Sequence, residues 1–75
     1  MAGVEKIVEK MQRQPYGITF SESQKVLEAY GFKVVRHKGS HYQFRRDSGE
    51  LITIKKDSPT VKRAYIEDIL SRIGK

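Results

Sequence analysis

The sequence contains no cysteine and no tryptophan, and only two of its 75 residues are proline. Without cysteine, the chain cannot form disulfides, bind zinc through thiolates or carry a thiolate nucleophile. A domain this small that folds without disulfides is expected in a reducing compartment, or in complex with a stabilising partner. We therefore predict a cytoplasmic protein.

Long apolar runs are also missing. The densest run, residues 51–54, is interrupted by Thr53 and is far shorter than the roughly 20 residues that a membrane helix needs. The first eleven residues alternate charged and apolar side chains, which is not the pattern of a signal peptide. Apolar residues make up 37% of the chain, enough for one modest core without a buried cofactor cavity. We predict a single domain over residues 1–75, with no membrane partner, no cofactor and an active site on the surface.

Acidic residues are scarce in one part of the chain. The formal net charge is +6, and segment 31–63, with nine basic and three acidic residues, carries all of this excess. Its basic residues are Lys33, Arg36, Lys38, Arg45, Arg46, Lys55, Lys56, Lys62 and Arg63. A polyanion would release counterions on binding such a segment, and nucleic acid is the commonest polyanionic partner. A solubilising face would have the same composition, so charge alone leaves both interpretations open.

Two helices are predicted before residue 31. The apolar residues of the first follow the i, i+3, i+4, i+7 spacing of an amphipathic helix: Val4, Ile7, Val8 and Met11. Pro15 and Gly17 would end this helix. Ser21 is expected to be the N-cap of the second, with Gln24 completing a capping box and Gly31 ending the helix.

Beyond residue 31 the apolar period becomes that of strands. Three runs rich in β-branched and aromatic residues carry apolar side chains at alternate positions: Phe32, Val34, Tyr42, Phe44, Ile52 and Ile54. Turn signals at 38–40 and 47–49 separate the runs, which predicts an antiparallel meander packed on helices. Ser58 and Pro59 would start a last helix that runs to about Ile73. The predicted fold class is α+β, and without its first helix the order α-β-β-β-α is that of double-stranded-RNA-binding domains.

The second predicted strand carries a polar row. Alternation places Tyr42 and Phe44 on the core face, so His41, Gln43 and Arg45 lie on the opposite, open face. A strand histidine beside a turn is commonly an ordinary surface residue. However, cationic and hydrogen-bonding groups are expected on the same face as His41, which makes it a candidate catalyst.

RNA cleavage is a reaction that suits these residue types. RNA supplies its own nucleophile, the 2′-hydroxyl, so a cleaving protein needs mainly proton transfer and stabilisation of a charged phosphorane. Imidazole titrates near pH 6.5 and can act as acid or base, while lysine and arginine can neutralise the developing charge. No metal is required. Gly39 and Ser40, just before His41, are small enough for a phosphodiester to approach the backbone.

His37 is a second histidine in the same region. If residues 38–40 form a three-residue hairpin loop, His37 and His41 are cross-strand neighbours on one face and could share acid and base duties. Two histidines without a third ligand make a weak metal site, so we predict none. We interpret His37 as incidental.

The string Lys-Gly-Ser-His-Tyr-Gln-Phe at residues 38–44 resembles the HicA toxin family. Gly31-Phe32 before it, residues 51–54 after it and the final helix follow in the same order, so the resemblance covers residues 21–73. HicA proteins are mRNA interferases of toxin–antitoxin pairs with a double-stranded-RNA-binding-like fold. The resemblance therefore implies metal-independent cleavage of mRNA with His41 as the functional histidine, and neutralisation by a HicB-type antitoxin.

Seven residues are expected to contact RNA or its phosphates beside His41: Lys38, Gly39, Ser40, Gln43, Arg45, Lys55 and Lys56. Many relatives have a proline and a histidine after the third strand, where this chain has residues 55–57, Lys-Lys-Asp. His41 would thus act with lysine or arginine help. Residues 1–20 are a helical addition to the family's fold that would brace it or contact an antitoxin or a second copy. A homodimer and a toxin–antitoxin hetero-oligomer both stay open.

Two other functions are compatible with the sequence. A non-catalytic RNA-binding module with a double-stranded-RNA-binding-like fold would use the same basic face. Tyr42 and Phe44 could then stack on bases, although their phase with Ile52 and Ile54 favours core packing. An interaction protein that attracts an acidic partner would also be basic. The function we predict is the ribonuclease toxin.

Overall fold

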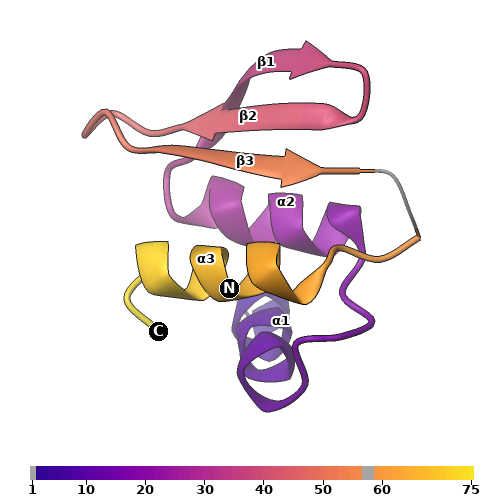
Figure 1. Ribbon diagram of the computed structural model, residues 1–75. Helices are drawn as coiled ribbons and strands as arrows, with labels where there is room; N and C mark the ends of the chain where they lie inside the picture. The colour runs from indigo at the N-terminus through magenta and orange to yellow at the C-terminus, as the bar shows by residue number, and fades with distance from the viewer. Residues whose placement is uncertain (1, 57–58) are drawn as a thin grey trace.

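The computed structural model describes residues 2–56 and 59–75 of the chain. Its elements follow in the order α1 (Ala2–Arg13), α2 (Phe20–Ala29), β1 (Lys33–Lys38), β2 (His41–Arg45), β3 (Leu51–Lys55) and α3 (Arg63–Arg72). The strands form one layer, α2 and α3 form a second beneath it, and α1 lies on the far side of these helices (Figure 1). This arrangement confirms the predicted α+β fold, with α-β-β-β-α after an additional helix. Within the described part of the chain, each helix is too short or too polar to cross a bilayer.

The hydrophobic core lies where these layers meet. The largest fully buried side chains come from all three helices, two strands and the loops: Met11, Ile18, Val26, Leu27, Phe32, Phe44, Ile52, Ile54, Ile66 and Ile69. Val4 and Val8 of α1 are buried as well, so the apolar face predicted for this helix is confirmed. Because α1 shares this core, it is packed on the fold and is not a free arm.

The N-terminus of α2 differs from the prediction. Its N-cap is Thr19, whose hydroxyl accepts the backbone N–H of Glu22 at 3.1 Å, while the Glu22 carboxylate accepts the backbone N–H of Thr19 at 3.0 Å. Ser21, the predicted cap, lies inside the first turn. Both positions match the capping-box pattern, but a start at Phe20 lets that aromatic ring enter the core, where it is 7% exposed.

The last helix also begins later than predicted. Ser58 lies outside the described residues, Pro59 is not helical, and α3 starts at Arg63. The segment before α3 is held extended by the chain preceding α2: the backbone N–H of Val61 donates to Ile18 at 2.7 Å, and Thr19 and Thr60 form a β-bridge. These backbone groups are therefore engaged in long-range pairing and do not join a helix. The predicted end near Ile73 is confirmed.

The sheet is the predicted antiparallel meander, in the order β1-β2-β3. Its Phe44, Ile52 and Ile54 are buried, as expected, but every side chain of β1 is exposed, Val34 to 38%. The β1 side chains are exposed because the main helix–strand packing is that of α3 on β3, the strand at the opposite edge of the sheet.

Candidate functional site

The β1–β2 hairpin determines which side chains share a face. Its loop is the two residues Gly39 and Ser40, because Lys38 pairs with His41 and His37 pairs with Tyr42. Gly39 has a φ of 59°, in the left-handed region that glycine adopts without strain. The three-residue loop considered from the sequence, which would pair His37 with His41, is therefore wrong.

A bulge in β1 produces this register. Val34 pairs with Phe44 and Arg36 pairs with Gln43, so Val35 has no residue opposite it. Without the bulge, the alternation from Val34 onward would place His37 opposite His41. The extra residue turns Arg36 toward the open face and His37 toward the helix side.

His37 and Lys56 support the loop that precedes His41. The His37 ring stacks on Tyr42, with centroids 4.0 Å apart and an interplanar angle of 12°. Its Nε2 lies 2.7 Å from the carbonyl oxygen of Gly39, which requires the Nε2–H tautomer or the imidazolium as donor. The backbone N–H of Lys56 donates to the Ser40 carbonyl at 2.6 Å. Both carbonyls of the loop are therefore engaged, and His37 has a structural contact.

Three rows of side chains cross the open face, because directly paired residues in adjacent antiparallel strands face the same side. The first row is Lys38, His41 and Lys55; the second is Arg36, Gln43 and Thr53; the third is Lys33, Arg45 and Leu51. His41 thus lies on the central strand with a lysine on each side. Its side chain is exposed, as acid–base chemistry on a polymer requires.

The first two rows surround a surface hollow of about 340 Å³, which is lined by Arg36, Lys38, Gly39, His41, Gln43 and Thr53. Arg45 and Lys33 of the third row line a neighbouring depression. Lys55 lies opposite His41. Ser40 is half-buried, and its contribution to the site is the loop itself.

Lys56 is the predicted site residue that the structure places elsewhere. Its Nζ lies 5.0 Å from the ring centroid of Phe20 and 5.9 Å from that of Tyr42, both on the helix side of the sheet. The ammonium group is thus attracted to aromatic faces there and does not join His41.

Arg36 and Thr53 line the hollow but were not among the predicted site residues. Thr53 could have been found from alternation, because it lies between the core residues Ile52 and Ile54. Arg36 could not, because simple alternation from Val34 assigns it to the core side. Only the bulge reverses that assignment.

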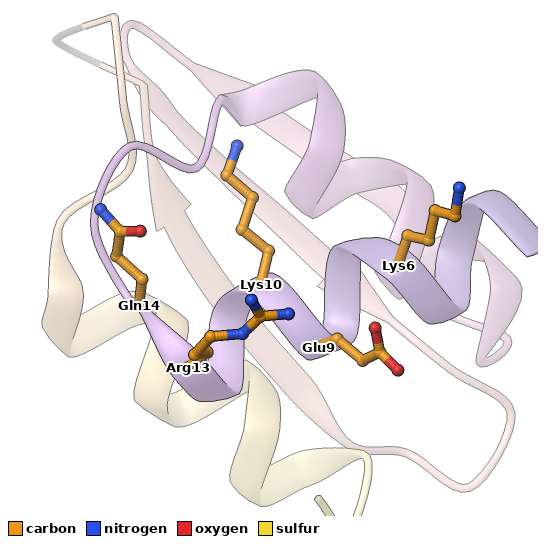
Figure 2. Close-up of a pocket in the computed structure, with 5 residues that line it drawn as sticks. All are labelled: Lys6, Glu9, Lys10, Arg13 and Gln14. Atoms are coloured by element: carbon orange, nitrogen blue, oxygen red, sulfur yellow. The ribbon is translucent and has the colours of Figure 1, made fainter.

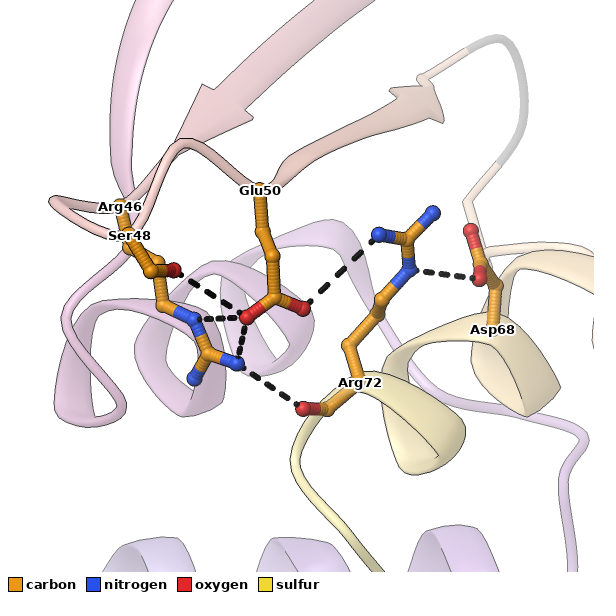
Figure 3. Close-up of polar contacts among 5 residues, drawn as sticks. All are labelled: Arg46, Ser48, Glu50, Asp68 and Arg72. Carbon is orange, nitrogen blue, oxygen red and sulfur yellow. Dashed lines mark hydrogen bonds and ion pairs between the residues drawn. The ribbon is translucent and has the colours of Figure 1, made fainter.

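The hollow is strongly cationic. None of the described residues that line it is acidic, and in the same part of the chain neither Arg36, Lys38 nor Arg45 forms an ion pair. Two other arginines have structural roles: Arg46 and Arg72 both form ion pairs with the Glu50 carboxylate, which joins the β2–β3 turn to α3 (Figure 3). Across residues 2–56 and 59–75, no group of three potential histidine or carboxylate metal ligands occurs.

A second hollow, of about 360 Å³, lies along α1 and the residue after it. Figure 2 shows its lining residues, Lys6, Glu9, Lys10, Arg13 and Gln14. Its charge is mixed: it contains a carboxylate, and Lys10 lies 3.5 Å from Glu22. It has no histidine, so it offers no group for proton transfer near neutral pH. The open face of the sheet is therefore the candidate site.

A protein-family model described as the HicA toxin of bacterial toxin–antitoxin matches residues 20–75. The match begins at the first residue of α2 and runs to the end of the chain, so it includes the whole sheet and α3 but not α1. No curated protein and no solved structure matches the chain.

Proposed function

The chain belongs to the HicA toxin family of bacterial toxin–antitoxin systems, and from this premise we propose that it is an mRNA interferase that cleaves RNA on the open face of its sheet. The observation that carries the proposal is the first row, in which the exposed imidazole of His41 lies between Lys38 and Lys55. The described residues that line the hollow include cations but no carboxylate, which supports an anionic substrate.

In the proposed mechanism, His41 transfers the protons and the lysines stabilise charge. The neutral imidazole removes the proton of the 2′-hydroxyl as that oxygen attacks the adjacent phosphorus. A bond forms from phosphorus to O2′, the bond to O5′ breaks, and the imidazolium returns a proton to the departing O5′. The products are a 2′,3′-cyclic phosphate and a 5′-hydroxyl. Lys38, Lys55 and Arg36 offset the negative charge of the phosphorane.

The proposed partners are mRNA and a HicB-type antitoxin. Arg36, Lys38 and Arg45, which have no ion pair in the described chain, would attract an acidic antitoxin surface as well as RNA. We assign RNA cleavage to residues 20–75 and treat the preceding segment, with α1, as a helical extension that braces α2 and α3.

The proposal is tested by incubating the purified protein with RNA in the presence of a chelator. We expect cleavage to be slowed at least about a hundredfold by His41→Ala, the range expected when an acid–base catalyst is removed. The variant should unfold at the same temperature and bind RNA as before, because His41 is exposed. Lys6→Ala, in the hollow along α1, is the matched surface control and should cleave normally.

The same pair of variants separates the alternatives. Growth arrest on expression of the wild-type protein, relieved by His41→Ala, supports a catalytic toxin. Equal arrest by the His41→Ala variant contradicts the mechanism. Salt-dependent RNA binding without cleavage by the wild-type protein would identify a non-catalytic RNA-binding module instead.

A further inference from the structure

The second row of the open face, Arg36, Gln43 and Thr53, has side chains unlike those of the first. It carries one cation, one amide and one hydroxyl, a set suited to hydrogen bonding rather than to proton transfer. We propose that this row is a recognition subsite for a nucleobase, preferably guanine, in the nucleotide next to the scissile phosphate. The inference rests on the proposed ribonuclease function and adds sequence preference to it.

The spacing of the rows supports this assignment. Gln43 follows His41 by two residues on the same strand, so the rows are about 7 Å apart. A phosphate held at His41 would leave the base of the same nucleotide within reach of the second row. Lys38 and His41 of the first row and all three residues of the second line one continuous hollow, so the phosphate and the base would share it without a barrier between them.

The side chains of this row are available for a ligand. Gln43 and Thr53 are half-buried in the middle of the sheet face, yet neither side chain has a hydrogen bond to any other described residue. Arg36 is exposed and, in the same part of the chain, has no ion pair. Polar groups that are partly desolvated and unpaired gain most from a partner that satisfies them.

The preference for guanine follows from donors and acceptors. The guanidinium of Arg36 is a planar fork that only donates, and guanine presents two adjacent acceptors, O6 and N7. At the corresponding edge, adenine and cytosine each present an amino donor, which Arg36 cannot accept. Among the described residues that line the hollow, none is a carboxylate that would favour those amino groups. Single-stranded RNA exposes its base edges to this kind of recognition.

The bulge at Val35 provides an independent structural reason for assigning base recognition to the second row. It places Arg36 beside Gln43 on the open face, where regular pairing would direct it to the helix side. A bulge commonly redirects a side chain beside a functional site. Here it completes a row of hydrogen-bonding groups across all three strands.

The first test measures binding without cleavage. Short single-stranded oligonucleotides that are 2′-O-methylated, and so cannot be cut, differ only in one central base, and fluorescence anisotropy gives their affinity for the full chain. We expect guanine to bind roughly tenfold or more tightly than the other bases. Arg36→Lys keeps the charge but loses the fork, and should remove most of this preference. Gln43→Ala should weaken it, whereas Arg13→Lys, the matched control in the hollow along α1, should leave it unchanged.

The second test maps cleavage positions on a mixed-sequence RNA. We expect the wild-type protein to cut next to guanine and the Arg36→Lys variant to cut more evenly. Equal affinity for all four bases, or a preference that survives Arg36→Lys, overturns the subsite. Guanine-selective binding with no cleavage of any RNA contradicts the proposed ribonuclease and supports the subsite, so the two proposals fail separately.

Discussion

His37 and His41 are four residues apart, but their side chains have different surroundings. His41 is exposed between two lysines on the open face, whereas His37 stacks on Tyr42 and hydrogen-bonds the Gly39 carbonyl. The difference arises from the strand register. His37 pairs with Tyr42, which is next to His41 on β2, and neighbouring residues of a strand face opposite sides of the sheet. Of the two, only His41 lines the hollow on the open face.

At this scale, His37 can be tested through stability. His37→Phe keeps the ring stacking and removes the hydrogen bond to Gly39, while His37→Gln keeps a donor of similar reach and removes the stacking. We expect each to lower the free energy of unfolding by about 1 kcal/mol, and His37→Ala to lower it further. Denaturant unfolding measures these differences. A His37→Ala variant as stable as the wild type would show that the loop does not depend on this side chain.

The element that matters most for the site is β1. Its bulge at Val35 absorbs one residue, so Arg36 faces Gln43 and the hairpin closes on two residues. The helices do not determine this register, because all the β1 side chains are exposed. Pairing with β2 and the short Gly39-Ser40 turn must do so.

Deletion of Val35 is therefore expected to be tolerated. Without it, Val34 would still pair with Phe44 and Arg36 with Gln43, and the pairing would become regular. The variant should fold, and NMR should still detect contacts between the His37 and Tyr42 rings. Deletion of Ser40 is the contrasting case, because Lys38 and His41 could not stay paired across one residue. Loss of the ring contacts in the Val35 deletion would contradict the assigned register.

Across the whole molecule, one polar cluster ties the sheet to the last helix. The Glu50 carboxylate forms ion pairs with Arg46 and Arg72 (Figure 3). Arg46 also donates a hydrogen bond to the Arg72 carbonyl at 3.3 Å, and Arg72 forms an ion pair with Asp68 at 3.3 Å. The Arg46 guanidinium lies 4.7 Å from the centroid of the Phe32 ring. Hydrogen bonding from Arg46 is the main reason that the pKa of Glu50 lies below its ordinary value of 4.5.

This pKa shift predicts how stability depends on pH. A carboxylate with a lowered pKa in the folded state contributes stability above its unfolded pKa, near 4.5, and that contribution is lost as the pH falls through the folded value. Glu22 contributes in the same direction, because the backbone N–H of Thr19 lowers its pKa. We expect Glu50→Gln to lower the melting temperature at pH 7. We also expect the melting temperature of this variant to fall less steeply than that of the wild type as the pH is lowered.

Thermal unfolding between acidic and neutral pH measures this effect. Glu67→Gln is the control, because its ion pair with Arg63 is exposed on one helix face and such pairs contribute little. If the melting temperature falls equally in acid for the wild type and for Glu50→Gln, Glu50 does not contribute to the loss of stability at low pH.

Much of the fold and part of the site could be predicted from local patterns. Apolar spacing located α1, the meander and the end of α3, and alternation assigned His41, Gln43 and Arg45 to one face. The predicted N-cap of α2 and start of α3 were wrong, because Phe20 enters the core and because the backbone of Val61 bonds that of Ile18. Such contacts join residues far apart in the sequence, so no local pattern contains them.

The sequence by itself determined the class of the fold, the excess of positive charge in segment 31–63 and the histidine within the Gly-Ser-His string, because composition and periodicity are local properties. The tertiary structure alone decided which of those cations lie near His41 on the open face. Pairing across strands placed Lys38 and Lys55 beside it, the bulge added Arg36, and aromatic rings drew Lys56 to the other side. Register depends on hydrogen bonds between strands and on one unpaired residue, and these exist only once the chain has folded.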